Sequence, residues 1–366
     1  MSEELNISYK RSGNYNVVIS DSLDAFKDCF EEIFKGQNIK VLIISDTNVA
    51  PLYMESVKSM LLGISDMVCE YIIEAGEKSK NSDNALLCLK YLKEHDFHRS
   101  DVIIALGGGV VGDLSGYVAS VYMRGIKYVQ LPTSLLAMAD SSIGGKCAID
   151  LDGFKNMIGS VYMPLLVYEN LAFLNTLNER EYACGMAEIL KAGLIKNGSF
   201  YEWLIMNFDR INDKESEALT FMLNEACKIK KKVVEEDPYE EGERMLLNFG
   251  HTVGHAIEKC SDFNYNHGES VALGMIAAAY ISWKRNLLSM EEFYEIRDMF
   301  VPFNLPISVD KLNTDLILNA ITYDKKQVNG SLNFILLKKI GKAVIVKDIS
   351  EDEIKEAAAN LVVEWD

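Results

Sequence analysis

The chain has few cysteines and no long hydrophobic run. Its seven cysteines are odd in number, scattered and never spaced as C-x-x-C, a pattern typical of reduced thiols in a cytoplasmic protein. No stretch of about eighteen apolar residues is present, and the polar residues 1–6 lack the charged-then-apolar pattern of a signal peptide. We therefore expect a cytoplasmic protein that is neither secreted nor inserted in a membrane.

Positive charge and proline are also scarce. Lysine and arginine number 37 against 54 aspartates and glutamates, which gives a net charge of −17. We expect no nucleic-acid partner, because neutralising phosphates along a duplex requires a basic surface. With six prolines and 49% hydrophobic residues, the composition is that of an ordinary globular protein, and 366 residues favour two domains.

Short β-branched runs alternate with amphipathic stretches in the first half of the chain. This β-α-β-α-β order predicts a mostly parallel, Rossmann-like sheet with helices on both faces. The expected elements are strands at residues 40–45, 67–73, 101–106, 127–131 and 165–168 and a helix at 81–94.

The periodicity becomes helical from about Asn175. The expected elements are helices at residues 180–195, 214–236, 246–260 and 269–285 and a hairpin of strands 332–337 and 343–346. We predict an α/β domain over residues 1–165 and a mainly α-helical domain over residues 166–366.

A glycine-rich turn follows the third expected strand. Leu106-Gly-Gly-Gly-Val-Val-Gly-Asp113 contains G-x-G-x-x-G between a strand and a helix, where the backbone can approach a pyrophosphate and the helix N-terminus favours negative charge. The turn predicts a dinucleotide ligand, although a plain tight turn is the alternative. The acidic residue usual about twenty positions later is missing, and Asp46 is the candidate for a ribose contact.

A second glycine cluster carries hydroxyls and lysines. It runs from Pro132-Thr133-Ser134 through Asp140 to Gly144-Gly145-Lys146 and is soon followed by Lys155 and Asn156. Such groups suit phosphate or sugar oxygens. The alternative, a solvated loop, fits poorly because apolar residues are interleaved throughout, so we interpret the segment as a binding element.

Three of the five histidines lie between His251 and His267. His251 and His255 are four residues apart and share a helix face, and Glu188 lies on an apolar helical run upstream. Catalytic zinc takes three protein ligands. The candidates number four, Glu188, His251, His255 and His267, and their spacing leaves open which three bind the metal. The remaining histidine would be placed for proton transfer. In the alternative interpretation, one or two of the histidines are only polar groups at helix ends.

Basic residues cluster around these elements although the chain is acidic. Lys191 lies one turn after Glu188, and Arg244 shares a face with His251 if that helix begins early enough. Lysine and arginine facing a metal imply an anionic substrate carrying phosphate or carboxylate. The basic residues concerned are Arg124, Lys146, Lys155, Lys191, Lys230, Arg244 and Lys325.

Several of these motifs, taken together and in order, resemble those of the 3-dehydroquinate synthases. They are Gly107-Gly-Gly-Val-Val-Gly-Asp113, Arg124-Gly125, Asp140-Ser-Ser-Ile-Gly-Gly-Lys146, Lys155-Asn-Met-Ile-Gly159, Gly185-Met-Ala-Glu-Ile-Leu-Lys191, Asn248-Phe-Gly-His-Thr-Val-Gly-His255 and His267-Gly-Glu269. The resemblance extends from about Asp46 to Lys326. The chain departs from the family at Ser134, where a threonine is usual, and at Cys147, which replaces a threonine.

The resemblance implies a cyclase that depends on NAD and on a divalent metal, zinc or cobalt. Its substrate would be the sugar phosphate 3-deoxy-D-arabino-heptulosonate 7-phosphate and its products 3-dehydroquinate and phosphate. The reaction would proceed by transient oxidation, phosphate elimination, reduction and intramolecular aldol closure, within the shikimate pathway of aromatic amino acid biosynthesis. A homodimer is also implied.

The resemblance also implies roles for individual residues. Metal ligands would be Glu188, His251 and His267. Substrate contacts would be Asp140, Lys146, Asn156, Lys191, Lys230, Arg244, Asn248, His255 and Lys325 or its neighbour Lys326, with Arg124 reaching the phosphate in the neighbouring subunit. The catalytic set would be His255, Lys146, Asn248 and Lys230. NAD contacts would be Asp46, Glu77, Lys80, Gly108, Gly109, Val110, Asp113, Thr133, Ser134, Lys146, Lys155 and Thr176.

Three rival functions are less consistent with the residues. Cyclases that make 2-deoxy-scyllo-inosose or an epi-valiolone act on substrates without a carboxylate, whereas this chain has Arg244, Asn248 and Lys325 together. A glycerol-dehydrogenase-like enzyme would release NADH. A non-catalytic nucleotide-binding protein would not need an intact set of metal ligands and a basic pocket.

Overall fold

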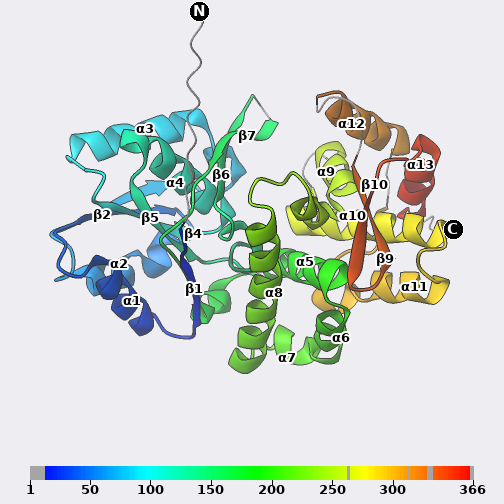
Figure 1. Ribbon diagram of the computed structural model, residues 1–366, viewed down its shortest axis with the longest axis horizontal. Helices are drawn as coiled ribbons and strands as arrows, with labels where there is room; N and C mark the ends of the chain where they lie inside the picture. Colours follow the sequence, from blue (N-terminus) through cyan, green and yellow to red (C-terminus); the bar gives the residue numbers. More distant parts are fainter. Residues whose placement is uncertain (1–12, 153, 262–263, 311–312, 328–332, 363–366) are drawn as a thin grey trace, which may run out of the picture.

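The computed structural model describes residues 13–152, 154–261, 264–310, 313–327 and 333–362. Its first half is a six-stranded, wholly parallel sheet with strand order β1-β8-β5-β4-β2-β3 (Figure 1). The strands are β1 (Asn16–Ser20), β2 (Lys40–Asp46), β3 (Met67–Ile73), β4 (Val102–Gly107), β5 (Lys127–Pro132) and β8 (Leu166–Asn170). Short helical segments in this half are η1 (Glu77–Ser79), η2 (Tyr122–Arg124), η3 (Ala137–Ser141) and η4 (Leu171–Thr176).

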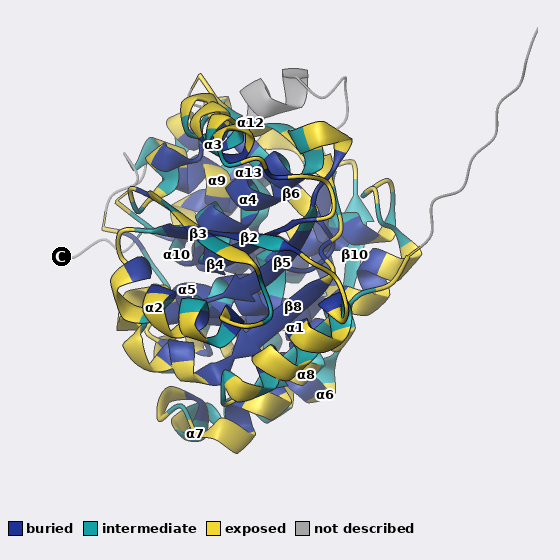
Figure 2. Ribbon diagram, turned by 90° about the vertical axis from the view of Figure 1, so that its left-hand side faces the viewer, coloured by how far each residue is buried: buried dark blue, intermediate teal, exposed yellow. Residues whose placement is uncertain are grey.

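Alternate residues of the central strands enter two separate hydrophobic clusters. On β2, Val41 and Ile43 pack with one cluster, and Leu42 and Ile44 with the other. Helices α1 (Asp24–Phe34) and α2 (Ala50–Leu61) cover the first face, and α3 (Ser82–Glu94) and α4 (Gly109–Val121) cover the second. A parallel sheet buried on both faces explains the continuous apolar runs in its strands (Figure 2). This confirms the predicted α/β architecture.

The second half is mainly helical and shares the first hydrophobic cluster with the sheet. Its helices are α5 (Glu179–Lys196), α6 (Gly198–Met206), α7 (Phe208–Asn212), α8 (Ser216–Glu236), η5 (Glu243–Asn248), α9 (His251–Cys260), α10 (His267–Lys284), α11 (Met290–Asp298), η6 (Val301–Phe303), α12 (Thr314–Gln327) and α13 (Glu351–Asn360). The predicted hairpin near the end is present as antiparallel β9 (Phe334–Lys339) and β10 (Lys342–Val346).

The structure differs from the sequence prediction in four places. Strand β1 was not predicted, and β8 ends at Asn170, two residues later than the predicted strand. The segment treated as a glycine-rich binding element continues into an antiparallel hairpin, β6 (Lys146–Leu151) and β7 (Phe154–Val161). The helix predicted over residues 246–260 is broken at Gly250. The division of the chain into two domains stays a prediction.

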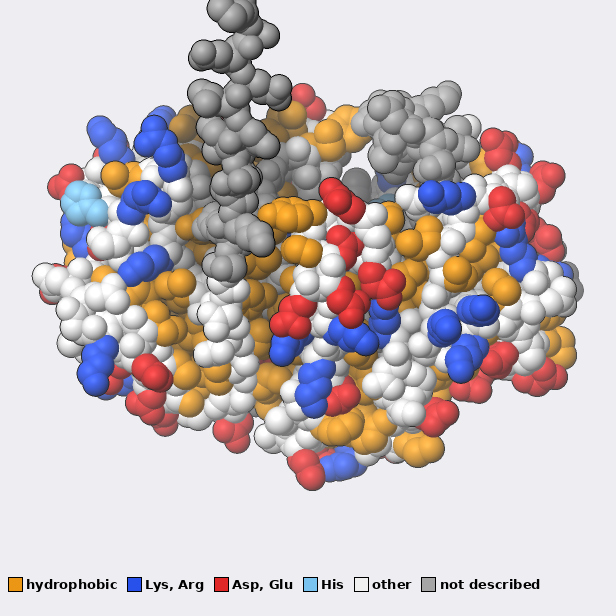
Figure 3. All heavy atoms as spheres, in the orientation of Figure 1, with side chains coloured by type: hydrophobic (Ala, Val, Ile, Leu, Met, Phe, Trp, Pro, Cys, Tyr) orange, Lys and Arg blue, Asp and Glu red, His pale blue; other side chains and the backbone are white. Residues whose placement is uncertain are grey.

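The described helices include none with enough length and hydrophobicity to cross a membrane. On the face shown in Figure 3, acidic and basic side chains are interspersed with apolar ones.

The sheet buries one carboxyl group that no expected function uses. Glu169 on β8 has no exposed surface, and the Cys227 thiol on α8 donates to its Oε1 over 3.6 Å. Burial raises the pKa of Glu169 from 4.5 to about 8, because a charged carboxylate loses its hydration in the interior. Glu169 is therefore protonated in the folded chain at neutral pH.

We predict that Glu169 makes the chain less stable as pH rises from about 4.5 to about 8. In this window the unfolded glutamate is ionised while the folded one keeps its proton, so the loss is at most about 1.4 kcal/mol per pH unit. Glu169→Gln should flatten this slope in urea unfolding measured across the window. Glu55→Gln, on the exposed face of α2, is the control, and equal slopes in the wild type and Glu169→Gln would contradict the prediction.

Candidate functional site

Glu188, His251 and His267 meet in the helical half. Glu188 Oε1 lies 3.7 Å from His251 Nε2 and 3.5 Å from His267 Nε2. One ligand atom from each of the three residues lies within 4.8 Å of the others, and they form the only such group in the described part of the chain. The donor set of one carboxylate and two imidazoles is one that catalytic zinc sites use.

Two glycine contacts hold the helices that carry these histidines close together. His251 opens α9 after Gly250, whose φ of 82° is in the left-handed region, and His267 opens α10. A Cβ atom at Gly274 of α10 would lie 1.9 Å from the Gly250 carbonyl oxygen, and one at Gly254 of α9 would lie 2.8 Å from the backbone of α10. Only glycine permits this approach, which brings the first residues of both helices to Glu188.

Glu188 is buried, and neither of its oxygens accepts a hydrogen bond of good geometry. Its Oε2 forms an ion pair with Lys191, one turn later on α5. Burial acts to raise the pKa of Glu188, but Lys191 and the two histidines outweigh it and hold the pKa well below 4.5. A buried carboxylate with unused lone pairs fits a bound cation.

His251 and His267 differ in their electrostatic surroundings. Burial and nearby Lys191 hold the pKa of His251 well below 6.5, so its ring is neutral, as a metal ligand requires. Burial also acts to lower the pKa of His267, but the carboxylates of Glu188 and Glu258 raise it to about 9. A cation at Nε2 would take the place of that proton.

His255 lies beside the group but not in it. Its ring centroid is 5.2 Å from that of His251 and 5.8 Å from that of His267. The side chain reaches solvent, yet protein encloses much of the ring, and this burial together with His267 lowers its pKa to about 4. His255 is therefore neutral at pH 7 and able to accept a proton.

The expected substrate residues are held by ion pairs and backbone contacts. Lys230 of α8 forms an ion pair with Asp140 of η3, which lies between β5 and β6. Arg244 is buried and donates to the carbonyl oxygens of Pro238, over 2.7 Å, and Gly144, over 3.4 Å. Because the segment before His251 is a 3-10 turn and a glycine bend, Arg244 and His251 do not share one helix face.

Glu240 was not identified from the sequence, although it contacts two expected substrate residues. Its carboxylate pairs with Lys146 and accepts from Asn248 Nδ2 over 2.7 Å. No spacing or motif marks Glu240 in an acidic stretch of the chain, so its position becomes apparent only in the structure.

The glycine-rich turn lies where the strand order reverses, between β2 and β4. Strand β4 neighbours β2 and β5, so the carboxyl ends of β2 and β4 meet beside the Gly107–Gly109 turn. Ligands of open α/β sheets bind at such a switch point. A Cβ at Gly112 would lie 2.9 Å from Gln130 Oε1, so this glycine lets α4 pack closely on the sheet.

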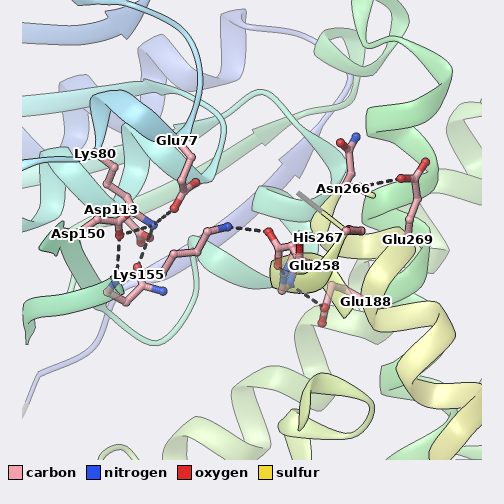
Figure 4. A network of polar contacts seen from close by, with 12 residues as sticks. Glu77, Lys80, Asp113, Asp150, Lys155, Glu188, Glu258, Asn266, His267 and Glu269 are labelled. Carbon is pink, nitrogen blue, oxygen red and sulfur yellow. Dashed lines mark hydrogen bonds and ion pairs between the residues drawn. The ribbon is translucent and has the colours of Figure 1, made fainter. Parts of the chain in front are cut away.

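Buried Lys80 connects several of the expected NAD residues (Figure 4). Its Nζ lies 2.7 Å from Glu77, 3.3 Å from Asp113 and 3.8 Å from Asp150. Burial raises the pKa of Asp113 to about 6 even though Lys80 opposes the shift. Lys80 also donates to Asn156 Oδ1 over 2.8 Å, which places Asn156, an expected substrate contact, with the expected cofactor residues.

The other expected NAD residues have local partners. Thr133 donates its backbone N–H to Gly107, and a Cβ at Gly108 would lie 3.3 Å from Ser134 Oγ. Asp46 Oδ1 accepts from the backbone N–H groups of Asn48 and Val49. Thr176 contacts the Tyr53 hydroxyl.

Two expected substrate residues stand apart from these clusters. Arg124 is exposed at the end of η2. The side chains of Lys325 and Lys326 lie outside the described residues.

Lys155 and Glu258 connect the sheet half to the histidine group. Lys155 Nζ on β7 lies 2.7 Å from Glu258 Oε1 on α9, and Glu258 Oε2 lies 3.8 Å from His267 Nδ1 (Figure 4). Burial acts to raise the pKa of Glu258, but His267 and Lys155 lower it to about 2. The sequence analysis missed Glu258, although its position seven residues after His251 places it on the same helix face.

The chain matches two parts of one known protein family. One family model, described as the N-terminal part of 3-dehydroquinate synthase, matches residues 70–184, and another, described as the C-terminal part, matches residues 185–327. The 3-dehydroquinate synthase of Desulforamulus reducens is 44% identical over 317 residues, which are 86% of this chain and 88% of that protein.

Solved structures of related cyclases have the same fold. The 2-epi-5-epi-valiolone synthase ValA of Streptomyces hygroscopicus, with NAD+ and Zn2+ bound, has a TM-score of 0.89 and 27% identity, covering 98% of this chain and 99% of its own. A 2-deoxy-scyllo-inosose synthase complexed with carbaglucose-6-phosphate, NAD+ and Co2+ has a TM-score of 0.86 and 25% identity, covering 95% of this chain and 97% of its own. The chain therefore belongs to the 3-dehydroquinate synthase family, as its sequence matches show and the shared fold supports.

Proposed function

We propose that the chain converts 3-deoxy-D-arabino-heptulosonate 7-phosphate to 3-dehydroquinate and phosphate, as a carbon-oxygen lyase of the shikimate pathway. The observation that carries the proposal is the group of Glu188, His251 and His267, connected through Glu258 and Lys155 to the hairpin of the sheet half. Family membership supports the same activity.

NAD and zinc or cobalt are the proposed cofactors. When bound, NAD supplies a reversible hydride acceptor, and a divalent cation at Glu188, His251 and His267 supplies a Lewis acid for the substrate hydroxyls. The proposed NAD contacts lie around Gly108 and Lys80, at the switch point of the sheet.

The chain's own side chains bind the substrate and transfer its protons in this proposal. Arg244 and Asn248 face the substrate carboxylate. Lys146, which shares the Glu240 carboxylate with Asn248, contributes positive charge. An anionic substrate has to displace the Glu240 carboxylate from Lys146 and Asn248. His255, neutral at pH 7, is the proton acceptor.

The paired side chains of Lys230 and Asp140 complete the proposed substrate site. Lys230 is buried, and its ion pair with Asp140 connects α8 to the segment before β6. Such a pair holds both side chains in one geometry, so that they orient substrate hydroxyls without reorganising.

The nearest rival activity is that of a cyclase whose substrate has no carboxylate. The buried guanidinium of Arg244 favours the dehydroquinate reaction, because its Nε has no hydrogen-bond partner and a carboxylate binds a guanidinium through two parallel bonds.

A homodimer in the cytoplasm is part of the proposal. Exposed Arg124 is proposed to reach the phosphate held by the neighbouring subunit, and exposed apolar side chains, Val121 and Met123, lie next to it. All seven cysteines are free thiols, which is consistent with a reducing compartment.

We predict that the purified chain, given NAD, zinc and the heptulosonate phosphate, releases phosphate without accumulating NADH. A chelator should abolish this release, and added zinc should restore it, because the cation polarises the reacting hydroxyls. Phosphate and NADH are followed together in one assay. Steady formation of NADH, or no turnover after metal is restored, would contradict the proposed activity.

The ligand assignment predicts that His267→Ala loses the metal and that His255→Ala keeps it. His267 Nε2 faces Glu188, whereas the His255 ring lies outside the group. Metal content after dialysis, measured by mass spectrometry, checks the prediction. Equal loss of metal from both variants would show that the assignment is wrong.

The shared site predicts complementation between inactive variants. Arg124→Ala and Lys230→Ala chains, each inactive alone, should regain about a quarter of wild-type activity when mixed equally and reassociated, because each mixed dimer has one complete site. Lys146→Ala mixed with Lys230→Ala is the matched control and should stay inactive, because both defects fall in residues of one subunit's own site. No recovery in verified mixed dimers would contradict the role of Arg124.

A further inference from the structure

We propose that Glu258 is a positioning residue for the metal site, which orients the His267 ring so that Nε2 faces the cation and is itself held by Lys155. The inference deepens the proposed function and rests on its assignment of His267 as a ligand. It concerns a side chain for which neither the sequence motifs nor the expected reaction gives a role.

The position of Glu258 on its helix favours this role. His251, His255 and Glu258 occupy successive turns of α9, at positions one, five and eight of the helix, so they share one face. That face is turned towards the start of α10, where His267 lies. Glu258 is 6% exposed, and a carboxylate buried to this degree has to be compensated by nearby polar or charged groups.

The His267 ring lies between two carboxylates. Nε2 is 3.5 Å from Glu188 Oε1, and Nδ1 is 3.8 Å from Glu258 Oε2. In a neutral imidazole one nitrogen carries the proton and the other has a free lone pair, so a carboxylate that accepts from Nδ1–H leaves the Nε2 lone pair for a cation. The separation at Nδ1 exceeds a hydrogen bond, and a shift of about 1 Å would close it.

Lys155 holds Glu258 from the opposite side. Its Nζ is 2.7 Å from Glu258 Oε1, while the other oxygen of Glu258 faces His267. Lys155 belongs to β7 of the hairpin in the sheet half, and Glu258 belongs to α9 of the helical half. The orientation of a metal ligand in one half therefore depends on where the hairpin of the other half lies. Figure 4 shows Lys155 pointing towards Glu258, beside His267.

The test measures binding of Co2+ alone, without NAD or substrate, by titration of the full chain while its visible absorption is followed. Glu258→Ala should weaken the affinity by about 10- to 100-fold, the usual cost of removing a partner of a ligating histidine. Glu258→Gln keeps the size of the side chain and an acceptor oxygen but loses the charge, so its affinity should fall between those of Glu258→Ala and the wild type.

Glu353→Gln is the matched control for a general loss of stability. Glu353 also forms a short ion pair, with Arg285, but on α13. This variant should lower the midpoint of thermal unfolding and leave Co2+ affinity unchanged. Unchanged affinity in both Glu258 variants, or an equal loss in Glu353→Gln, would overturn the inference.

Lys155→Met tests whether Lys155 acts through Glu258. It should weaken Co2+ binding in the wild-type background and have no further effect in the Glu258→Ala background, because its partner is then missing. An equal effect in both backgrounds would overturn the role of Lys155.

Failure of the inference and failure of the proposed function give different results. If the Glu258 variants bind Co2+ as the wild type does while the wild type releases phosphate, only the inference fails. If the wild-type chain binds no Co2+, the metal dependence of the proposed function fails and the inference fails with it.

Discussion

The arrangement of the helical half depends on one buried carboxylate. Glu188 is 4% exposed, and removing a carboxylate from water costs several kcal/mol unless opposite charge compensates it. Lys191 on the same helix supplies one compensating charge, and two histidines from two other helices face the other oxygen. Side chains from three helices thus compensate the negative charge of one carboxylate, and a divalent cation would compensate it more fully than they do.

A series of contacts connects Glu188 to the sheet half. Glu188 faces His267, His267 faces Glu258, and Glu258 is paired with Lys155 on the β6–β7 hairpin. The hairpin also carries Asn156, which contacts Lys80 beside the glycine-rich turn. The expected dinucleotide site and the expected metal site are therefore connected by charged and polar side chains and not only by the shared hydrophobic core.

Much of the fold could be predicted from the sequence, because strands buried on both faces leave continuous apolar runs and the turn after β4 has a recognisable glycine pattern.

The four candidate metal ligands could also be found from their residue types. Their spacing alone left open which three converge, and only the resemblance to the 3-dehydroquinate synthases named Glu188, His251 and His267. The structure brings these three together because His251 and His267 each open a helix and those helices approach each other through a tertiary contact. Glu240 and Glu258 were missed for a similar reason, since acidic residues are common in this chain and only their partners distinguish them. The break at Gly250 depends on a left-handed backbone conformation that hydrophobic periodicity does not reveal.

The contact between Gly274 and Gly250 has a consequence for how this chain can change in evolution. Gly274 carries no functional group and lies in the middle of a buried helix, where alanine is the better helix former by about 1 kcal/mol. A single methyl group there would meet the Gly250 carbonyl at 1.9 Å, separate α9 from α10 and draw His251 away from His267. Selection for the site therefore extends to Gly274, which takes no part in chemistry. Alanine would make the helix locally more stable at this position, but it would disrupt the site.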